Sequence, residues 1–435
     1  MPGEDEVGGV AALTQAGEGV VRAGKTVFVA GALPGESIRF RRTRRHRQHD
    51  DGQLLEVIES SAARVTPRCK HFGICGGCAL QHLAPEAQIE AKDAELRDHF
   101  ERVARVTPQE WLPPLRGPEW AYRRRARLGA KYVIKKGRVL VGFRERLAPY
   151  VADVERCEVL SAPVGPLIGE LAVLLGSLSI RERLPQIEVA VADNATALVL
   201  RVLQPPTAED TDKLQEFAQA HGVRFYLQPK GLDSVRPLRE GEPPLFYRLP
   251  RFGLELEFAP TDFVQINAAI NEALVSLGVE LLDLRSDSTV LDLFCGLGNF
   301  TLPLSKVAGS VVGVEGDQVL VDRARHNARR NGIENAEFHV ADLSKALAPG
   351  IAWMQRPFTH VLIDPPRAGA REILPAIAAL KPRAVLYISC HPGSLARDVG
   401  ILTHELGFSV RAAGVLDMFP HTSHVESLAL LEGRP

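Results

Sequence analysis

The C-terminal part of the chain alternates short β-prone runs with helical segments, and this alternation constrains the fold more than any other feature. A helix from Thr261 to about Leu284 is followed by strand, glycine turn, helix, strand and helix in regular order. The predicted strands are Thr289–Leu293, Val311–Val314, Ala336–Val340, His360–Ile363 and Ala384–Ile388. Strands that alternate with helices form a parallel sheet covered on both faces. The sequence therefore predicts an α/β fold in which residues 261–435 form a doubly wound, Rossmann-like domain.

Two further units are predicted ahead of this domain. In residues 1–62, short β-prone runs between glycine-rich turns predict a small β barrel of the oligonucleotide-binding (OB-like) kind. Residues 63–260 contain a cysteine segment and then a helical stretch from Pro85 to about Val103. Short strands follow at Ile187–Val191, Ala197–Val202 and Leu254–Phe258. This middle region is interpreted as a mixed α+β domain.

The net charge of −1 does not by itself indicate a nucleic-acid partner, but the basic residues are clustered. Residues 39–47 include six arginines, and residues 119–146 carry ten Lys or Arg against two acids. Such clusters suit a phosphate backbone, although either one alone could be an ordinary solvated face. The two together favour a nucleic-acid partner.

Other features bear on location and assembly. No run approaches the roughly 18 apolar residues of a membrane helix, and the acidic start lacks the features of a secretory signal. We therefore expect a cytoplasmic protein with no membrane association. Nothing in the sequence demands an oligomer or an obligate protein partner, so a monomer is expected.

Polar residues at the ends of successive predicted strands indicate a cofactor pocket. Gly296 and Gly298 form a turn after the first strand, Glu315 ends the second, Asp342 follows the third, and Asp364 begins an Asp-Pro-Pro-Arg segment after the fourth. Ligands of doubly wound sheets bind beyond the carboxyl ends of the strands. The third glycine of the dinucleotide fingerprint is absent, so the set fits S-adenosylmethionine better than NAD.

A nucleophile and a base are indicated by Cys390, at the end of the fifth strand, and Glu426, near the chain end. Carbon 5 of uracil is a poor nucleophile, but a thiolate added at carbon 6 creates an enolate that can attack a methylsulfonium. Cysteine suits this role because it both attacks and leaves readily. Glu426 is the candidate base that removes the carbon-5 proton. The alternative for Cys390 is a small buried core residue.

Three segments resemble the signature segments of the RNA uracil-5-methyltransferases. They are Asp364-Pro-Pro-Arg-Ala-Gly369, Ile388-Ser-Cys390 and Asp417-Met-Phe-Pro-His-Thr-Ser-His-Val-Glu426. The resemblance implies that Cys390 is the nucleophile and Glu426 the proton acceptor. It also implies contacts to S-adenosylmethionine from Gln265, Phe294, Asn299, Glu315, Asp342 and Asp364.

Four cysteines outside this region form a candidate metal site: Cys69, Cys75, Cys78 and Cys157. Spacing alone leaves zinc and an iron–sulfur cluster equally open, since both accept four thiolates. The same spacing is similar to the [4Fe-4S] site of the family members that act on 23S ribosomal RNA, and the N-terminal barrel resembles an RNA-binding TRAM domain. Together they imply a 23S ribosomal RNA substrate, methylated at uridine 1939.

Other functions stay open on the sequence. The modified uridine could lie elsewhere in ribosomal RNA or in tRNA. An amino-group methyltransferase would share the Asp-Pro-Pro segment, but Arg367 stands where those enzymes place a stacking aromatic, and they need no thiol. The chain could also be an RNA-binding ribosome-assembly factor whose catalysis is secondary.

Overall fold

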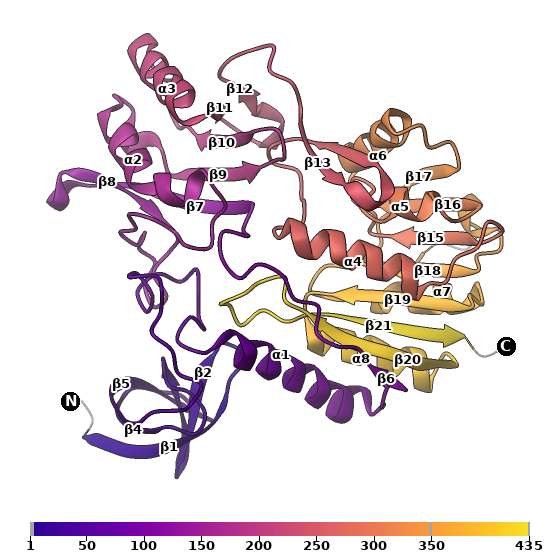
Figure 1. Cartoon of the computed structure of the whole chain (residues 1–435), viewed down its shortest axis with the longest axis horizontal. Helices are drawn as coiled ribbons and strands as arrows, with labels where there is room; N and C mark the ends of the chain where they lie inside the picture. Colours follow the sequence, from indigo (N-terminus) through magenta and orange to yellow (C-terminus); the bar gives the residue numbers. More distant parts are fainter. Residues whose placement is uncertain (1–3, 348–349, 434–435) are drawn as a thin grey trace.

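The computed structural model describes residues 4–347 and 350–433. Figure 1 shows a small barrel at the N-terminus, a central sheet, and a larger sheet flanked by helices that completes the chain. The predicted fold class, α/β with an N-terminal barrel, a mixed central region and a Rossmann-like C-terminal domain, is confirmed.

The N-terminal unit is a closed barrel with the strand order β1-β2-β3-β5-β4. Its strands are β1 (Asp5–Leu13), β2 (Glu18–Ala23), β3 (Lys25–Ala30), β4 (Ser37–Arg45) and β5 (Asp50–Glu59). Alternate residues of β3 and β4 point into the core, where Val27, Val29, Ile38 and Phe40 have no solvent exposure. This period of two fixes the register of strands that bury one face.

The central unit is a six-stranded sheet with the order β12-β11-β10-β9-β7-β8. Its elements are β7 (Arg125–Val133), β8 (Arg138–Gly142), α2 (Val164–Ser177), β9 (Gln186–Val191), β10 (Thr196–Arg201), α3 (Ala208–His221), β11 (Val223–Gln228) and β12 (Arg236–Pro237). Leu171 and Leu175 of α2 are fully buried in the core that the helix shares with the sheet. This packing places the sheet between its helices and the rest of the molecule.

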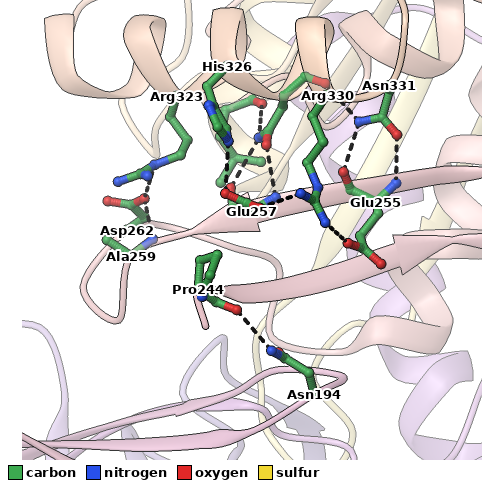
Figure 2. A network of polar contacts seen from close by, with 12 residues as sticks. Asn194, Pro244, Glu255, Glu257, Ala259, Asp262, Arg323, His326, Arg330 and Asn331 are labelled. Carbon is green, nitrogen blue, oxygen red and sulfur yellow. Dashed lines mark hydrogen bonds and ion pairs between the residues drawn. The ribbon is translucent and has the colours of Figure 1, made fainter. Parts of the chain in front are cut away.

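A hairpin connects the central unit to the C-terminal domain. It consists of β13 (Leu245–Leu249) and β14 (Leu254–Phe258), and it meets helix α6 (Gln318–Arg330). Figure 2 shows Glu257 of β14 reaching His326 at 2.8 Å and Arg330 at 2.9 Å. On the other side, the Asn194 amide donates to the Pro244 carbonyl at 2.9 Å. The hairpin is therefore tied to both neighbouring units.

The C-terminal sheet has eight strands in the order β17-β16-β15-β18-β19-β21-β20-β6. Its strands are β6 (Glu110–Trp111), β15 (Thr289–Leu293), β16 (Ser310–Glu315), β17 (Ala336–Val340), β18 (His360–Ile363), β19 (Ala384–Ser389), β20 (Phe408–Leu416) and β21 (Glu426–Gly433). Strands β15 to β19 pair in parallel, whereas β21 runs antiparallel between β19 and β20. All five strands predicted in this domain are present.

Helices cover both faces of this sheet. They are α1 (Pro85–His99), α4 (Ala268–Leu281), α5 (Thr301–Ser305), α6, α7 (Leu374–Ala379) and α8 (Pro392–His404). Val290 of β15 packs in one core with Leu274 of α4, while the next residue, Leu291, packs in the other core with Leu96 of α1 and Leu395 of α8. Strands buried on both faces need near-continuous apolar runs, and for this reason these strands could be predicted from the sequence.

The predicted start of one helix was wrong, and the end of another helix is π-helical. The helix that enters the C-terminal domain begins at Ala268, not at Thr261, because the Asn267 side chain accepts a hydrogen bond from Ile270 N–H and caps it. Gln265 consequently lies in a loop and not on a helix. The stretch after Pro85 is an α-helix only to His99 and continues as a π-helical turn over Phe100–Ala104.

Helix α1 lies on the C-terminal sheet although it precedes the central sheet in the chain. Figure 1 shows it running from the barrel to the edge of the large sheet, where β6 pairs with Ala412 and Ala413 of β20. Domain boundaries at residues 62 and 260 stay a prediction. Within residues 4–347 and 350–433, no helix combines the length and apolar character that crossing a membrane requires.

Candidate active site

Sheet register brings the predicted nucleophile and base together. Ser389 of β19 lies opposite Ser427 of β21, so one residue further along Cys390 faces Glu426. Directly opposed residues in antiparallel strands have Cα atoms roughly 4.5–5.5 Å apart. The two residues, separated by 35 others in the chain, therefore lie side by side at the end of the sheet where the parallel strands terminate.

The groups around this pair favour protonated forms. Burial, and after it the charge of Asp364, raises the pKa of Glu426 to about 8. Burial also raises the pKa of Asp364 to about 7, and burial with the charges of Glu426 and Asp364 raises that of Cys390 to about 11. Lys92 and Arg367 oppose the shift at Glu426. All three reactive groups keep partial solvent contact, so a substrate base can reach them.

The acids that end β16 and β17 lie beside the glycine turn or near it. The Glu315 carboxylate accepts hydrogen bonds from the N–H of Gly296 at 3.1 Å and of Gly316 at 2.7 Å. Asp342 is exposed, and its carboxylate, bonded to Lys345 and Ser344, has a pKa lowered to about 2. Both carboxyl groups offer oxygen acceptors at the carboxyl edge of the sheet, where ribose hydroxyls and an adenine amino group can donate to them.

Phe294 and Asn299 frame the turn after β15. Phe294 has a φ of 64°, a left-handed conformation that a bulky residue adopts only when its surroundings enforce it. The Asn299 side chain exchanges two hydrogen bonds with Asn271 of α4, at 2.9 and 3.0 Å, and accepts a third from the Tyr247 hydroxyl at 2.9 Å. Gln265 lines a small pocket together with Tyr247 and Asn271.

Three residues of this region, Tyr247, Asn271 and Asp292, were not predicted from the sequence. Tyr247 and Asn271 carried no recognisable signal, since a tyrosine in a hairpin and an asparagine in a helix are common. Asp292 did carry one, because it is a charged residue inside a buried strand. It is 1% exposed, bonds the Thr301 hydroxyl at 2.5 Å, and burial raises its pKa to about 7. A carboxyl lying under the glycine turn at this site is a further group that can face the cofactor.

The four predicted cluster cysteines converge in space. Burial raises the pKa of Cys75 to about 11 and that of Cys78 to about 12, and for Cys78 the charges of the three other thiolates add to the effect. Such mutual repulsion is relieved when a metal centre takes up the thiolates. Among the described residues, no three of these sulfurs lie within 4.8 Å of one another. Four thiolates brought together in this way suit either a zinc ion or an iron–sulfur cluster.

The arginine-rich stretch of the barrel is only partly available to a ligand. Arg42 pairs with Glu6 at 2.7 Å and with Asp50 at 2.8 Å, and it is largely buried. Arg39 and Arg41 pair with acids of neighbouring strands. The exposed arginines of the stretch are Arg39, on the outer face of β4, and Arg44, Arg45 and Arg47, toward the end of β4 and beyond it. The predicted six-arginine surface is thus smaller than the sequence suggested.

The second basic stretch is likewise partly internal. Arg124 pairs with Asp193 at 2.5 Å and Arg127 with Glu188 at 2.8 Å, while Arg125 donates to the Pro260 carbonyl. These bonds hold β7 against its neighbours and the loop that enters the C-terminal domain. A charge used in this way is not free for a phosphate backbone.

The sheet and the residues at its carboxyl edge are those of a Rossmann-type methyltransferase. Residues 253–434 match the family model described as tRNA (Uracil-5-)-methyltransferase. The chain is similar along nearly its whole length to proteins named 23S rRNA (uracil(1939)-C(5))-methyltransferase RlmD. It is 49% identical to that of Xanthomonas campestris pv. campestris strain 8004, covering 97% of this chain and 96% of the relative. It is also 49% identical to that of Methylococcus capsulatus, covering 99% and 98%.

A solved structure supports the fold. The tRNA (uracil-54, C5)-methyltransferase of Pyrococcus abyssi, in complex with S-adenosyl-L-homocysteine, superposes with a TM-score of 0.76 at 24% identity and covers 98% of this chain and 99% of that one. The chain belongs to the RNA uracil-5-methyltransferase family.

Proposed function

We propose that the protein transfers a methyl group from S-adenosylmethionine to carbon 5 of a uridine in 23S ribosomal RNA, at position 1939. The observation that carries the proposal is the proximity of Cys390 and Glu426, which adjoin Ser389 and Ser427, the last residues paired between β19 and β21. The target is supported by the names of relatives that match over 97% and 99% of the chain. Such an enzyme works where ribosomal RNA is modified, in the cytoplasm, and we propose that it acts there as a monomer.

In the proposed reaction, the Cys390 thiolate bonds to carbon 6 of the uracil. Carbon 5 of the resulting enolate then attacks the methyl group of S-adenosylmethionine, whose bond to sulfur breaks to release S-adenosylhomocysteine. Glu426 accepts the proton of carbon 5, the released electron pair restores the 5,6 double bond, and the thiolate leaves. Because the pKa of Glu426 is about 8, its carboxylate is a stronger base than an ordinary one and can take up this proton near neutral pH. A uridine within folded RNA must be flipped out to reach the thiol.

We propose that S-adenosylmethionine binds at the edge formed by Gln265, Phe294, Asn299, Glu315, Asp342 and Asp364. Glu315 and Asp342 supply oxygen acceptors for ribose and adenine donors, and the bonds from Gly296 and Gly316 hold the Glu315 side chain in place. The network of Asn299 with Asn271 and Tyr247 fixes an amide at the opposite side of the turn. Asp364 stands between this edge and Glu426, whose pKa its charge raises.

We further propose that Cys69, Cys75, Cys78 and Cys157 hold a [4Fe-4S] cluster, which would serve as a structural crosslink. The convergence of the four thiolates supports a metal centre, and the resemblance of the cysteine spacing to that of the [4Fe-4S] family members supports a cluster over zinc. The barrel beside it would serve as a TRAM-like RNA-binding unit through Arg44, Arg45 and Arg47.

The test is a methylation assay on protein purified without oxygen, with methyl-labelled S-adenosylmethionine and unmodified 23S ribosomal RNA or tRNA. Mapping should find 5-methyluridine at uridine 1939 with the wild type and none with Cys390→Ala. Label at another ribosomal position or in tRNA would refute the proposed target while keeping the chemistry. Tight RNA binding with no label on either RNA would favour a binding factor.

A further inference from the structure

The segment 417–425, which leads into Glu426, is held by a helix from the other half of the chain. The Lys92 ammonium of α1 donates to the Asp417 carboxylate at 2.7 Å and to the Phe419 carbonyl at 3.0 Å. Lys92 is 3% exposed and Asp417 is 6% exposed. The base therefore stands at the end of a segment that is anchored by a buried ion pair at its start.

A second contact, one helical turn earlier on α1, fixes the middle of the same segment. The Gln88 side chain accepts a hydrogen bond from the His421 N–H at 2.8 Å, and its amide contacts the His421 ring at 3.2 Å. His421 has a φ of 64°, which a non-glycine residue keeps only when its contacts enforce it. The Tyr122 hydroxyl also donates to the neighbouring Pro420 carbonyl at 2.9 Å. The segment is thus positioned by side chains distant in sequence.

Stability alone is a poor explanation for a lysine at position 92. A buried ion pair contributes little net stability compared with apolar residues of similar volume, because desolvating two charges offsets their attraction. Lys92 has a second effect, however. Four charged or titratable groups face the Glu426 carboxyl: Cys390, Asp364, Arg367 and Lys92. Only Lys92 and Arg367 of these favour its ionised form.

We propose that Lys92 is a positioning residue for the last step of the reaction, which keeps the Glu426 carboxyl in place by anchoring the start of the segment that leads to it. The inference rests on the proposed function. Loss of Lys92 would slow the transfer of the carbon-5 proton to Glu426 and hence departure of the Cys390 thiolate. Bond formation between Cys390 and carbon 6, and attack of carbon 5 on the methyl group, would continue. The enzyme should then accumulate as a methylated covalent adduct with RNA.

The test compares wild type with Lys92→Met, and uses Lys213→Met as a matched control. Lys213 pairs with Glu209 on the outer surface of α3, far along the chain from the site. Adduct is measured as RNA that stays attached to protein in a denaturing gel, and turnover is measured between pH 6 and 9. We expect Lys92→Met to accumulate adduct and to have a kcat about tenfold lower at pH 7. The rising limb of its pH profile should move up by about one pH unit, since a shift of one pH unit changes the ionised fraction of the base about tenfold. KM for RNA should fall about as much as kcat, because the steps up to methyl transfer, which set kcat/KM, are not slowed.

Lys92→Met leaves the Asp417 charge buried without its partner and could destabilise the fold. The double variant Lys92→Met/Asp417→Asn removes both charges, and its helical circular dichroism and melting temperature report whether it is folded. If the folded double variant shows the wild-type pH profile and no adduct, Lys92 has only a structural role and the inference is overturned. If the wild type itself gives neither 5-methyluridine nor adduct, the proposed function fails instead.

Discussion

Replacing Glu426 with Gln should remove a pH dependence from the stability of the protein. Burial, with a further contribution from the charge of Asp364, raises the pKa of this carboxyl from 4.5 to about 8. Between these values the folded protein holds a proton that the unfolded chain has released. The stabilisation is therefore fully present below pH 4.5 and is lost as the pH rises through about 8.

The magnitude follows from proton linkage. Where folded and unfolded states differ by one bound proton, the free energy of unfolding changes by about 1.4 kcal/mol per pH unit. From pH 6 to pH 8 the wild type should lose roughly 2 kcal/mol more than Glu426→Gln, because the slope flattens near the folded-state pKa. Glutamine resembles the protonated carboxyl in shape, so the variant should fold normally.

Urea unfolding of both proteins at pH 6, 7 and 8, without S-adenosylmethionine, gives the required comparison. Asp292 and Asp364 also have raised pKa values, of about 7, but they are present in both proteins and largely cancel in the difference. Exposed Glu405→Gln on the surface serves as the matched control. A wild-type-minus-variant difference that stays constant from pH 6 to 8 would refute the argument that Glu426 is held protonated by its surroundings.

Three further results are expected. Cys78→Ala should abolish iron binding by protein purified without oxygen, seen as lost iron content and visible absorbance, and full retention would contradict a four-thiolate site. Asn271→Ala leaves the Asn299 amide with one partner fewer, so S-adenosylhomocysteine should bind about tenfold more weakly by calorimetry, equivalent to about 1.4 kcal/mol. An unchanged affinity would show that Asn299 does not belong to the pocket. Gln88→Leu breaks the hydrogen bonds to His421 and to two backbone carbonyls, so the free energy of unfolding should fall by about 2–4 kcal/mol. An unaltered urea midpoint would show that these bonds do not contribute to stability.

The sequence predicted the parallel part of the large sheet well because its strands are buried on both faces. Thr289–Leu293, Ala336–Val340 and His360–Ile363 begin and end where predicted. The antiparallel strands β20 and β21 were not predicted. Both are buried apolar runs, which periodicity alone does not distinguish from buried helical segments, and what makes them strands is the partner across the sheet. The glycine-rich β1 was missed for a similar reason, since its neighbours in the barrel define it.

The candidate reactive residues of the site were predicted more fully than the contacts that hold those residues in place. Cys390, Glu426 and the acids at three strand ends stood out because each is a reactive or polar residue after an apolar run. The ion pair of Lys92 with Asp417 joins residues 325 apart in the chain, and no local pattern signals such a contact. Some arginines that the sequence pattern indicated for RNA binding, Arg42 above all, form ion pairs within the barrel instead.

By itself, the sequence predicted the layer architecture, and it singled out Cys390 and Glu426 as a candidate nucleophile and base and four cysteines as a candidate cluster site. These follow from apolar periodicity and residue chemistry, which are local properties. Only the tertiary structure decided that Glu426 stands opposite Cys390, that its pKa lies near 8, and that α1 holds the segment leading to it. Register, burial and the sign of neighbouring charges depend on which distant segments pack together, and chain order does not record that packing.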